Sequence, residues 1–204
     1  MTASVAVRPP IAVEDQARAD VYALLGRLFT RAPDHALLRA LATAPRLPPS
    51  AQSDWPTAFN RLADASQVME AEAAEQEYTD LFVGVGQSEV DLHASFWLKG
   101  IDAPLAQLRG ELAAQGLARR ADATLFEDHM GPLLEIMRLL VGGGPGVTPA
   151  SIAVQRAFFG RWLDDWPIRC CAAIKRTSIA NYYRRVAECT EIFLALERDS
   201  FAIE

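Results

Sequence analysis

The chain has 204 residues, of which 50% are hydrophobic and 23% are charged, and its formal net charge at pH 7 is −6. This length and apolar content suit one globular domain with a substantial buried core. The acidic balance excludes sequence-independent binding of nucleic acid, which needs clustered lysine and arginine to neutralise phosphates.

The first part of the chain predicts helices separated by proline-rich breaks. Apolar residues over 21–29 follow a helical period and stop just before Pro33. Asp34 is placed to cap a short second helix. The segment 45–56 contains four prolines and is predicted to be a loop.

The middle of the chain predicts a long helix or helix pair that runs to Phe82 and is broken at Gly84-Val85-Gly86. The stretch from there to Gly100 is aromatic and irregular. Apolar residues over 105–112 then predict another helix, which Gly116 closes.

A further helix is predicted over Met130–Val141, with Asp128 at its N-cap. The segment Gly142-Gly143-Gly144-Pro145-Gly146 is typical of a flexible connector. It lacks the Lys-Ser/Thr of a phosphate loop and follows a helix rather than a strand. Thr148-Pro149 is interpreted as the N-cap and first residue of the next helix.

The last third predicts a heavily apolar helix that Pro167 stops, and a final helix over 179–196. No stretch alternates with the period of a strand. We therefore predict an all-α fold, a single globular domain of eight to ten helices. The predicted parts are a flexible N-terminus (1–12), an N-terminal helical subdomain with an aromatic loop (13–141), a Gly/Pro connector (142–149) and a C-terminal helical part of the same fold (150–204).

Targeting and metal signals are weak in this sequence. Residues 1–10 have no apolar core of signal-peptide length, and the best apolar stretch, 130–141, is interrupted by charges. Three cysteines do not make a disulfide framework, and the histidines are scattered. We expect a cytoplasmic protein with reduced, buried thiols and no metal site.

Charge is unevenly distributed along the chain. Between Arg61 and Lys99 there are acidic residues but no basic one. This belt is either the solvated face of a helix or a surface that attracts a basic partner.

Two groups of residues could form a binding site. Asp128-His129 is either a helix cap with a partly buried neighbour or a receptor for an arginine, because a carboxylate can pair with a guanidinium in bidentate fashion. Phe96-Trp97, with Tyr78 and Phe82, is either core or a platform for an apolar peptide. We expect such a peptide between the 78–82 helix end and the Asp128 helix start.

Several short motifs occur in order along the chain. They are Tyr22-Ala23-Leu24-Leu25-Gly26-Arg27-Leu28-Phe29, Tyr78 with Leu81-Phe82-Val83-Gly84, Ser95-Phe96-Trp97, Asp128-His129, Gln155 with Phe158-Phe159, Trp162 and Trp166, and Tyr182-Tyr183. In order and spacing these motifs resemble the TorD/DmsD family of molybdoenzyme maturation chaperones, over roughly residues 15–198.

The resemblance implies a TorD-like cytoplasmic chaperone with no catalysis and no cofactor of its own. Such a chaperone holds the twin-arginine signal peptide and the precursor of a molybdopterin redox enzyme during cofactor insertion. A domain-swapped homodimer is one option, whereas nucleic acid and stable membrane insertion are not expected. By motif position, the peptide-binding residues of the family fall on Tyr22, Tyr78, Leu81, Trp97, Asp128 and His129.

The sequence also departs from the family pattern. Leu125-Phe126 stand where the family usually has Glu-Pro, and His93 stands where close relatives have tryptophan. The partner's signal is therefore expected to differ or to be absent. Two alternatives stay open: a nucleotide-binding protein or enzyme on a helical scaffold, and a helical adaptor without a redox client.

Overall fold

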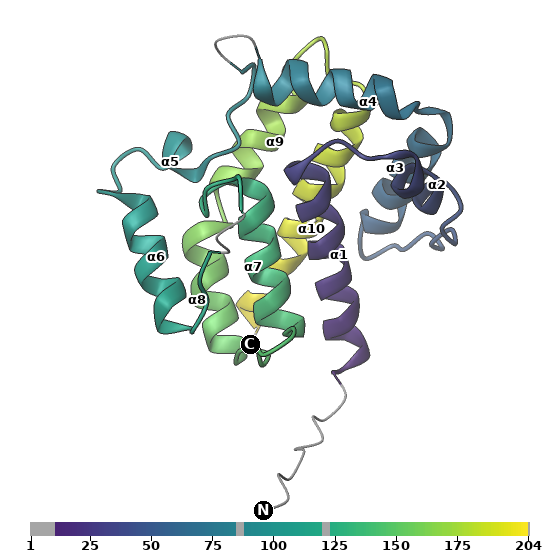
Figure 1. The fold of residues 1–204 in the computed structure, drawn as a ribbon. Coiled ribbons are helices and arrows are strands. Elements are labelled where there is room, and N and C mark those ends of the chain that lie inside the picture. The colour runs from purple at the N-terminus through teal and green to yellow at the C-terminus, as the bar shows by residue number, and fades with distance from the viewer. Residues whose placement is uncertain (1–10, 85–87, 120–122, 204) are drawn as a thin grey trace, which may run out of the picture.

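The structure is a computed structural model that describes residues 11–84, 88–119 and 123–203, and Figure 1 shows its fold. Within these ranges the only β-type pairings are two isolated bridges. The prediction of an all-α, single-domain protein is confirmed. The helices are α1 (Val13–Thr30), α2 (His35–Ala42), α3 (Trp55–Val68), α4 (Ala71–Tyr78), the π-helix η1 (Thr79–Val83), α5 (Ala94–Trp97), α6 (Pro104–Ala114), α7 (Met130–Gly142), α8 (Ile152–Trp162), α9 (Trp166–Arg176) and α10 (Tyr182–Ile203).

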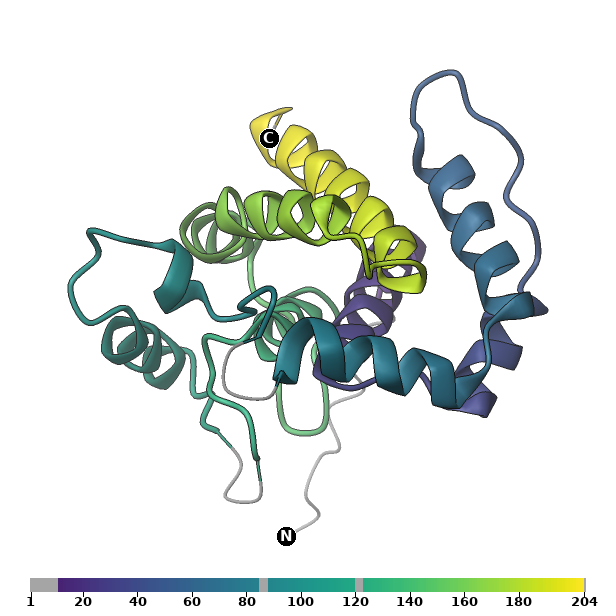
Figure 2. The same cartoon turned by 90° about the horizontal axis from the view of Figure 1, so that it is seen from above.

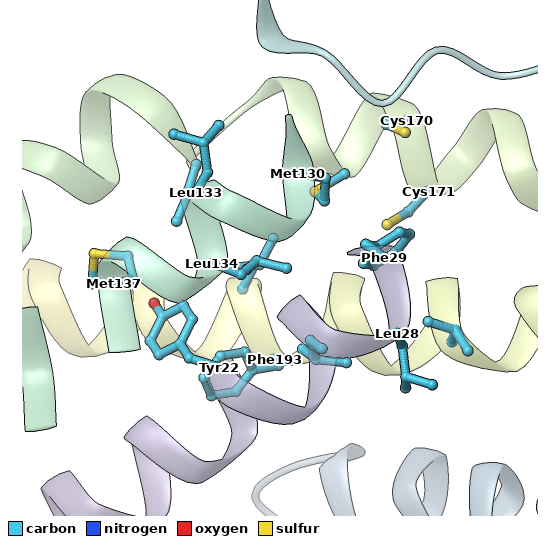
Figure 3. Close-up of a cluster of buried hydrophobic side chains, with 14 of the residues drawn as sticks. Tyr22, Leu28, Phe29, Met130, Leu133, Leu134, Met137, Cys170, Cys171 and Phe193 are labelled. Atoms are coloured by element: carbon cyan, nitrogen blue, oxygen red, sulfur yellow. The ribbon is translucent and has the colours of Figure 1, made fainter. Parts of the chain in front are cut away.

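The centre of the molecule is a bundle in which α1 packs along α7 and α10 packs on α9 and α3. Figure 2 shows α6 at the opposite side of this bundle from α2 and α3. Tyr22 of α1, Leu134 of α7 and Phe193 of α10 meet in the core (Figure 3). The predicted parts 13–141 and 150–204 therefore contribute to one continuous hydrophobic core rather than to two.

The close packing of α1 on α7 depends on two glycines. A Cβ added at Gly131 would lie 2.2 Å from Thr30 Oγ1 and 3.0 Å from the Gly26 carbonyl oxygen. A Cβ added at Gly26 would lie 3.2 Å from the Gly131 carbonyl oxygen. Side chains at both positions must be absent for the two backbones to approach so closely.

The predicted flexible connector is a closed turn. The backbone groups of Gly144 and Val147 pair in both directions, at 2.9 and 3.0 Å. Gly142 still belongs to α7, and a Cβ there would lie 2.9 Å from the Cβ of Ala19. The glycines of this segment thus allow close packing as well as a change of direction.

Three predicted helix boundaries need correction. Ser151, not Thr148, is the N-cap of α8, because the Ala150 N–H bonds to the Leu140 carbonyl at 2.7 Å and keeps the chain extended. Pro167 lies in the first turn of α9 and starts that helix, since the first turn does not require its N–H. The last helix begins at Tyr182, three residues later than predicted.

Two predictions for the first half hold. The Asp34 carboxylate accepts a hydrogen bond from the Leu37 N–H and caps α2, and the segment ending at Phe82 is a pair of helices, with a π-helix after α4. Gly84, with φ of 63°, follows the π-helix, while Val85 and Gly86 lie outside the described residues.

The acidic belt is only partly a solvated face. Glu77 faces the beginning of α10, where its carboxylate accepts hydrogen bonds from the N–H groups of Asn181, Tyr182 and Tyr183 at 2.8, 3.0 and 2.8 Å. A helix N-terminus has unpaired N–H groups and a positive partial charge, so a carboxylate stabilises it. Glu77 therefore ties α4 to α10.

Candidate functional site

Two segments far apart in sequence meet at the start of α7. His93 and His129 form an isolated antiparallel bridge. The Met130 N–H donates to the Leu92 carbonyl, and the Ala94 N–H donates to the Asp128 carbonyl, both at 2.8 Å. This bridge brings the aromatic loop and the Asp128-His129 pair together, as the sequence suggested.

The helix cap at this position is His129 rather than Asp128. His129 Nδ1 accepts a hydrogen bond from the Gly131 N–H at 3.1 Å. The Asp128 carboxylate instead accepts one from the Ser95 N–H of α5, at 3.2 Å. The prediction that Asp128 caps α7 is wrong, because the bridge fixes the backbone of residue 128 before the helix begins.

His129 is held in its neutral form. Burial and, to a smaller extent, the neighbouring His93 lower the pKa of His129 to about 4, although Asp128 and Asp91 oppose the shift. The two imidazole rings meet edge to face, with centroids 5.0 Å apart. A neutral ring leaves Nδ1 free to accept from the backbone, so the cap and the low pKa are consistent.

Three hollows lie next to three parts of the predicted site, and their volumes are about 450, 500 and 650 Å³. The largest of the three is at Asp128. It is lined by Asp91, His93, Ser95, Ala103, Pro104, Leu105, Ala106, Arg109, Phe126 and Asp128. The Phe126 side chain is 52% exposed, which is unusual for a large aromatic residue. The hollow therefore combines two carboxylates with an accessible aromatic ring.

Asp91 organises the loop from which it projects. One carboxylate oxygen accepts from the His93 N–H at 2.7 Å and lies 2.9 Å from His93 Nδ1. Its backbone carbonyl accepts from Trp97 Nε1 at 2.8 Å. The Asp91 side chain is still 35% exposed, so a partner can reach it.

A second hollow, of about 500 Å³, is formed by α5 and the loop that follows it. It contains Trp97 and the half-exposed Phe96, with Arg169 lying over the Trp97 ring and Lys99 over the Phe96 ring. Ser95, the residue before Phe96, lines the Asp128 hollow. The short helix α5 thus contributes to both hollows.

The structure separates the other predicted site residues. Tyr22 and Leu81 have no exposed surface, and the Tyr22 hydroxyl donates to Glu197 at 2.9 Å. Tyr78 lines the third hollow, of about 450 Å³, and its hydroxyl donates to the carbonyls of Phe29 and Thr30. Burial raises the pKa of Tyr78 to about 12. Tyr78 and Asp128 therefore line different hollows, not the single groove that the sequence suggested.

Within the described ranges, no group of three or more acidic, histidine or cysteine side chains could hold a metal ion. No helix in those ranges is both long and apolar enough to cross a membrane. The three cysteines are free and buried, as predicted.

Comparison with known proteins places this arrangement in a family. The family model described as "Nitrate reductase delta subunit" matches residues 48–172. The chain belongs to this family. The match confirms the resemblance to molybdoenzyme maturation chaperones and, with it, the prediction that the chain is not an enzyme.

Two individual proteins support the assignment. "Chaperone protein TorD" of Shewanella loihica (strain ATCC BAA-1088 / PV-4) is 25% identical over 199 residues, covering 90% of this chain and 92% of the relative. A crystal structure of a redox enzyme maturation protein from Archaeoglobus fulgidus matches with a TM-score of 0.55 at 15% identity. That match covers 95% of this chain and 99% of the other and supports the fold alone.

Proposed function

We propose that this member of the nitrate reductase delta subunit family is a cytoplasmic chaperone for a molybdenum-cofactor redox enzyme. It binds the enzyme's twin-arginine signal peptide and precursor and holds them during cofactor insertion and assembly. Family membership supports the maturation role. The observation that carries the peptide-binding part is the hollow in which Asp91 and Asp128 lie beside the exposed ring of Phe126.

The chemistry of this hollow suits an arginine followed by apolar residues. A guanidinium pairs with a carboxylate through two parallel hydrogen bonds, which a lysine cannot do. Asp128 is almost buried at 2% exposure, so its charge is poorly solvated and a bound cation would compensate it. The Phe126 ring offers apolar surface in the same hollow as that charge, and the Phe96 ring offers it in the second hollow.

The predicted site residues take different roles in this proposal. Asp128 and Trp97 line the two hollows at α5 and contact the partner. His129, Tyr22 and Leu81 are buried and support the site through the fold. Tyr78 lines the separate hollow beside α4, where the acidic Glu72 and Glu75 stand with the basic Arg27 and Arg31, and it has no assigned contact with the peptide.

The test is the variant Asp128→Asn, whose peptide affinity is measured by titration calorimetry. The peptide is the signal peptide of a redox enzyme encoded by a neighbouring gene. Asparagine keeps an oxygen that can accept from the Ser95 N–H, so the variant should remain folded, and thermal unfolding checks this. Loss of the charge-assisted pair should weaken peptide binding by about 1.5–3 kcal/mol, or roughly tenfold to a hundredfold.

Two controls make the result specific. Asp80→Asn removes an exposed carboxylate from η1, away from the hollow, and should leave the affinity nearly unchanged. A peptide with both arginines replaced by alanine should bind more weakly than the original. Equal affinity of the two peptides, or of Asp128→Asn and the unmodified chain, would contradict arginine recognition at this site.

A further inference from the structure

The Asp128 hollow already contains an arginine of the chain itself. Arg109 projects from α6 into the lining of this hollow, and its guanidinium forms a two-pronged pair with the carboxylate of Glu127. The two bonds join Nε to Oε1 at 3.0 Å and Nη2 to Oε2 at 3.1 Å. Glu127 directly precedes Asp128, which lines the hollow together with Asp91 and Arg109.

We propose that Arg109 is a specificity-determining residue that stands in for one arginine of the partner peptide. In the free protein, the Arg109 guanidinium is paired with the Glu127 carboxylate. When a peptide with two adjacent arginines binds, one arginine pairs with Asp128 and the other replaces Arg109 on Glu127. This inference rests on the proposed function of the hollow.

The burial of the two partners explains why the chain supplies its own arginine. Glu127 is only 8% exposed, and an unpaired carboxylate in that position would be costly. The pairing with Arg109 also holds the pKa of Glu127 below its usual range, so that Glu127 stays ionised. The carboxylate is therefore ready for any guanidinium that reaches it.

The same contacts explain why Arg109 can leave. Its side chain is 48% exposed, so a competing guanidinium can approach the pair from solvent. The exchange replaces one bidentate guanidinium with another, so the bonds to Glu127 are kept. Helix α6 stays anchored by Leu108 and Leu112, which are buried in the core, and only the Arg109 side chain has to swing out.

A second arginine–glutamate pair that involves α6 provides a control for net charge. Arg161 of α8 pairs with Glu111 of α6 at 3.0 Å, and its side chain is 46% exposed. This pair lines a different, apolar hollow between α6, α7 and α8. Arg161→Gln therefore removes the same charge as Arg109→Gln and disrupts another arginine–glutamate pair, but leaves Glu127 paired with Arg109.

The experiment measures calorimetric affinities of the unmodified chain and these variants for three synthetic peptides: one with two adjacent arginines and two with either arginine replaced by lysine. Arg109→Gln removes the competitor and should tighten binding of the two-arginine peptide by about two- to fivefold. The gain should be smaller for at least one lysine peptide and should vanish in Arg109→Gln/Glu127→Gln. Arg161→Gln should produce no comparable gain.

Several outcomes would overturn the inference. Unchanged or weaker binding by Arg109→Gln does so, and so does an equal gain from Arg161→Gln, which would indicate only net charge. If Arg109→Gln unfolds at a clearly lower temperature, Arg109→Lys replaces it in the experiment, because lysine keeps the charge but cannot form the two parallel hydrogen bonds. An affinity of Arg109→Lys equal to that of the unmodified chain would then overturn the inference. If Asp128→Asn still weakens binding, only this inference fails; if it does not, the proposed function fails as well.

Discussion

The body of α7 and the residues just before it are built in opposite ways. Along the body, Leu133, Leu134 and Met137 have no exposed surface and pack into the core shared with α1. Immediately before the helix, Asp128 and His129 are buried too, but they lie among polar groups and beside a half-exposed phenylalanine. The helix is therefore a rigid support that ends in a chemically varied lip.

This difference shows how a small helical protein can hold a carboxylate ready for a partner. The close α1–α7 contact fixes the helix, and the His93–His129 bridge fixes the loop against its start. The carboxylate of Asp128 is thereby oriented before a partner arrives, and less conformational freedom is lost on binding. In the proposed function, packing along the helix therefore supports recognition at its start.

The largest expected effect tests whether His129 belongs to the rigid support. Because its pKa is about 4 in the folded chain and about 6.5 when unfolded, the unfolded state binds more protons between these values. The free energy of unfolding should therefore fall as the pH drops from 6.5 towards 4, by up to about 3 kcal/mol from this residue.

Urea unfolding at several pH values checks this prediction. His129→Asn keeps a capping side chain and should show a flatter pH dependence than the unmodified chain. His35→Asn, which changes a histidine with a 67% exposed side chain, is the control for the loss of an imidazole. The same slope in His129→Asn and the unmodified chain would place His129 outside the support.

The next effect concerns the helix contact itself. Gly131→Ala introduces a Cβ that would lie 2.2 Å from Thr30 Oγ1 and 3.0 Å from the Gly26 carbonyl oxygen, so both the Thr30 side chain and the backbone of α1 would have to shift. We expect it to destabilise the fold by about 1–3 kcal/mol. The control is Gly160→Ala in α8, where a Cβ meets nothing within 4 Å, and a helical alanine should stabilise the protein by about 0.5–1 kcal/mol. Thermal unfolding of the two variants should thus shift in opposite directions; equal shifts would contradict the close contact.

The smallest effect sharpens the distinction at the lip. Phe126→Ala removes a ring that is half exposed and has the Arg119 guanidinium 5.6 Å from its centre, so stability should change by less than about 0.5 kcal/mol. Peptide affinity should decrease by about two- to fivefold, because apolar contact area is lost. Leu105→Ala, in the same lining but partly covered, is a useful comparison in the same calorimetric assay. Substantial unfolding of Phe126→Ala would show that this residue belongs to the core.

Local sequence pattern determined much of the fold. The helical period of apolar residues over 21–29 and 130–141 predicted helices α1 and α7 and their buried faces. Asp34 predicted a cap that the structure contains. These features depend on residues within one or two helical turns, so a short stretch of sequence holds all the necessary information.

Tertiary structure determines the contacts at the start of α7. No local pattern reveals that Glu77 caps a helix more than a hundred residues later, or that Arg109 pairs with Glu127. The sequence predicted Asp128 as the cap of α7, but with the bridge between His93 and His129 in place the cap is His129. Sequence motifs located Asp128 and Trp97, but the division of Tyr78 and Asp128 between separate hollows depends on how the helices pack. Pairings of this kind arise only after distant segments have been brought together, because hydrogen bonds and ion pairs require contact in space and not proximity in sequence.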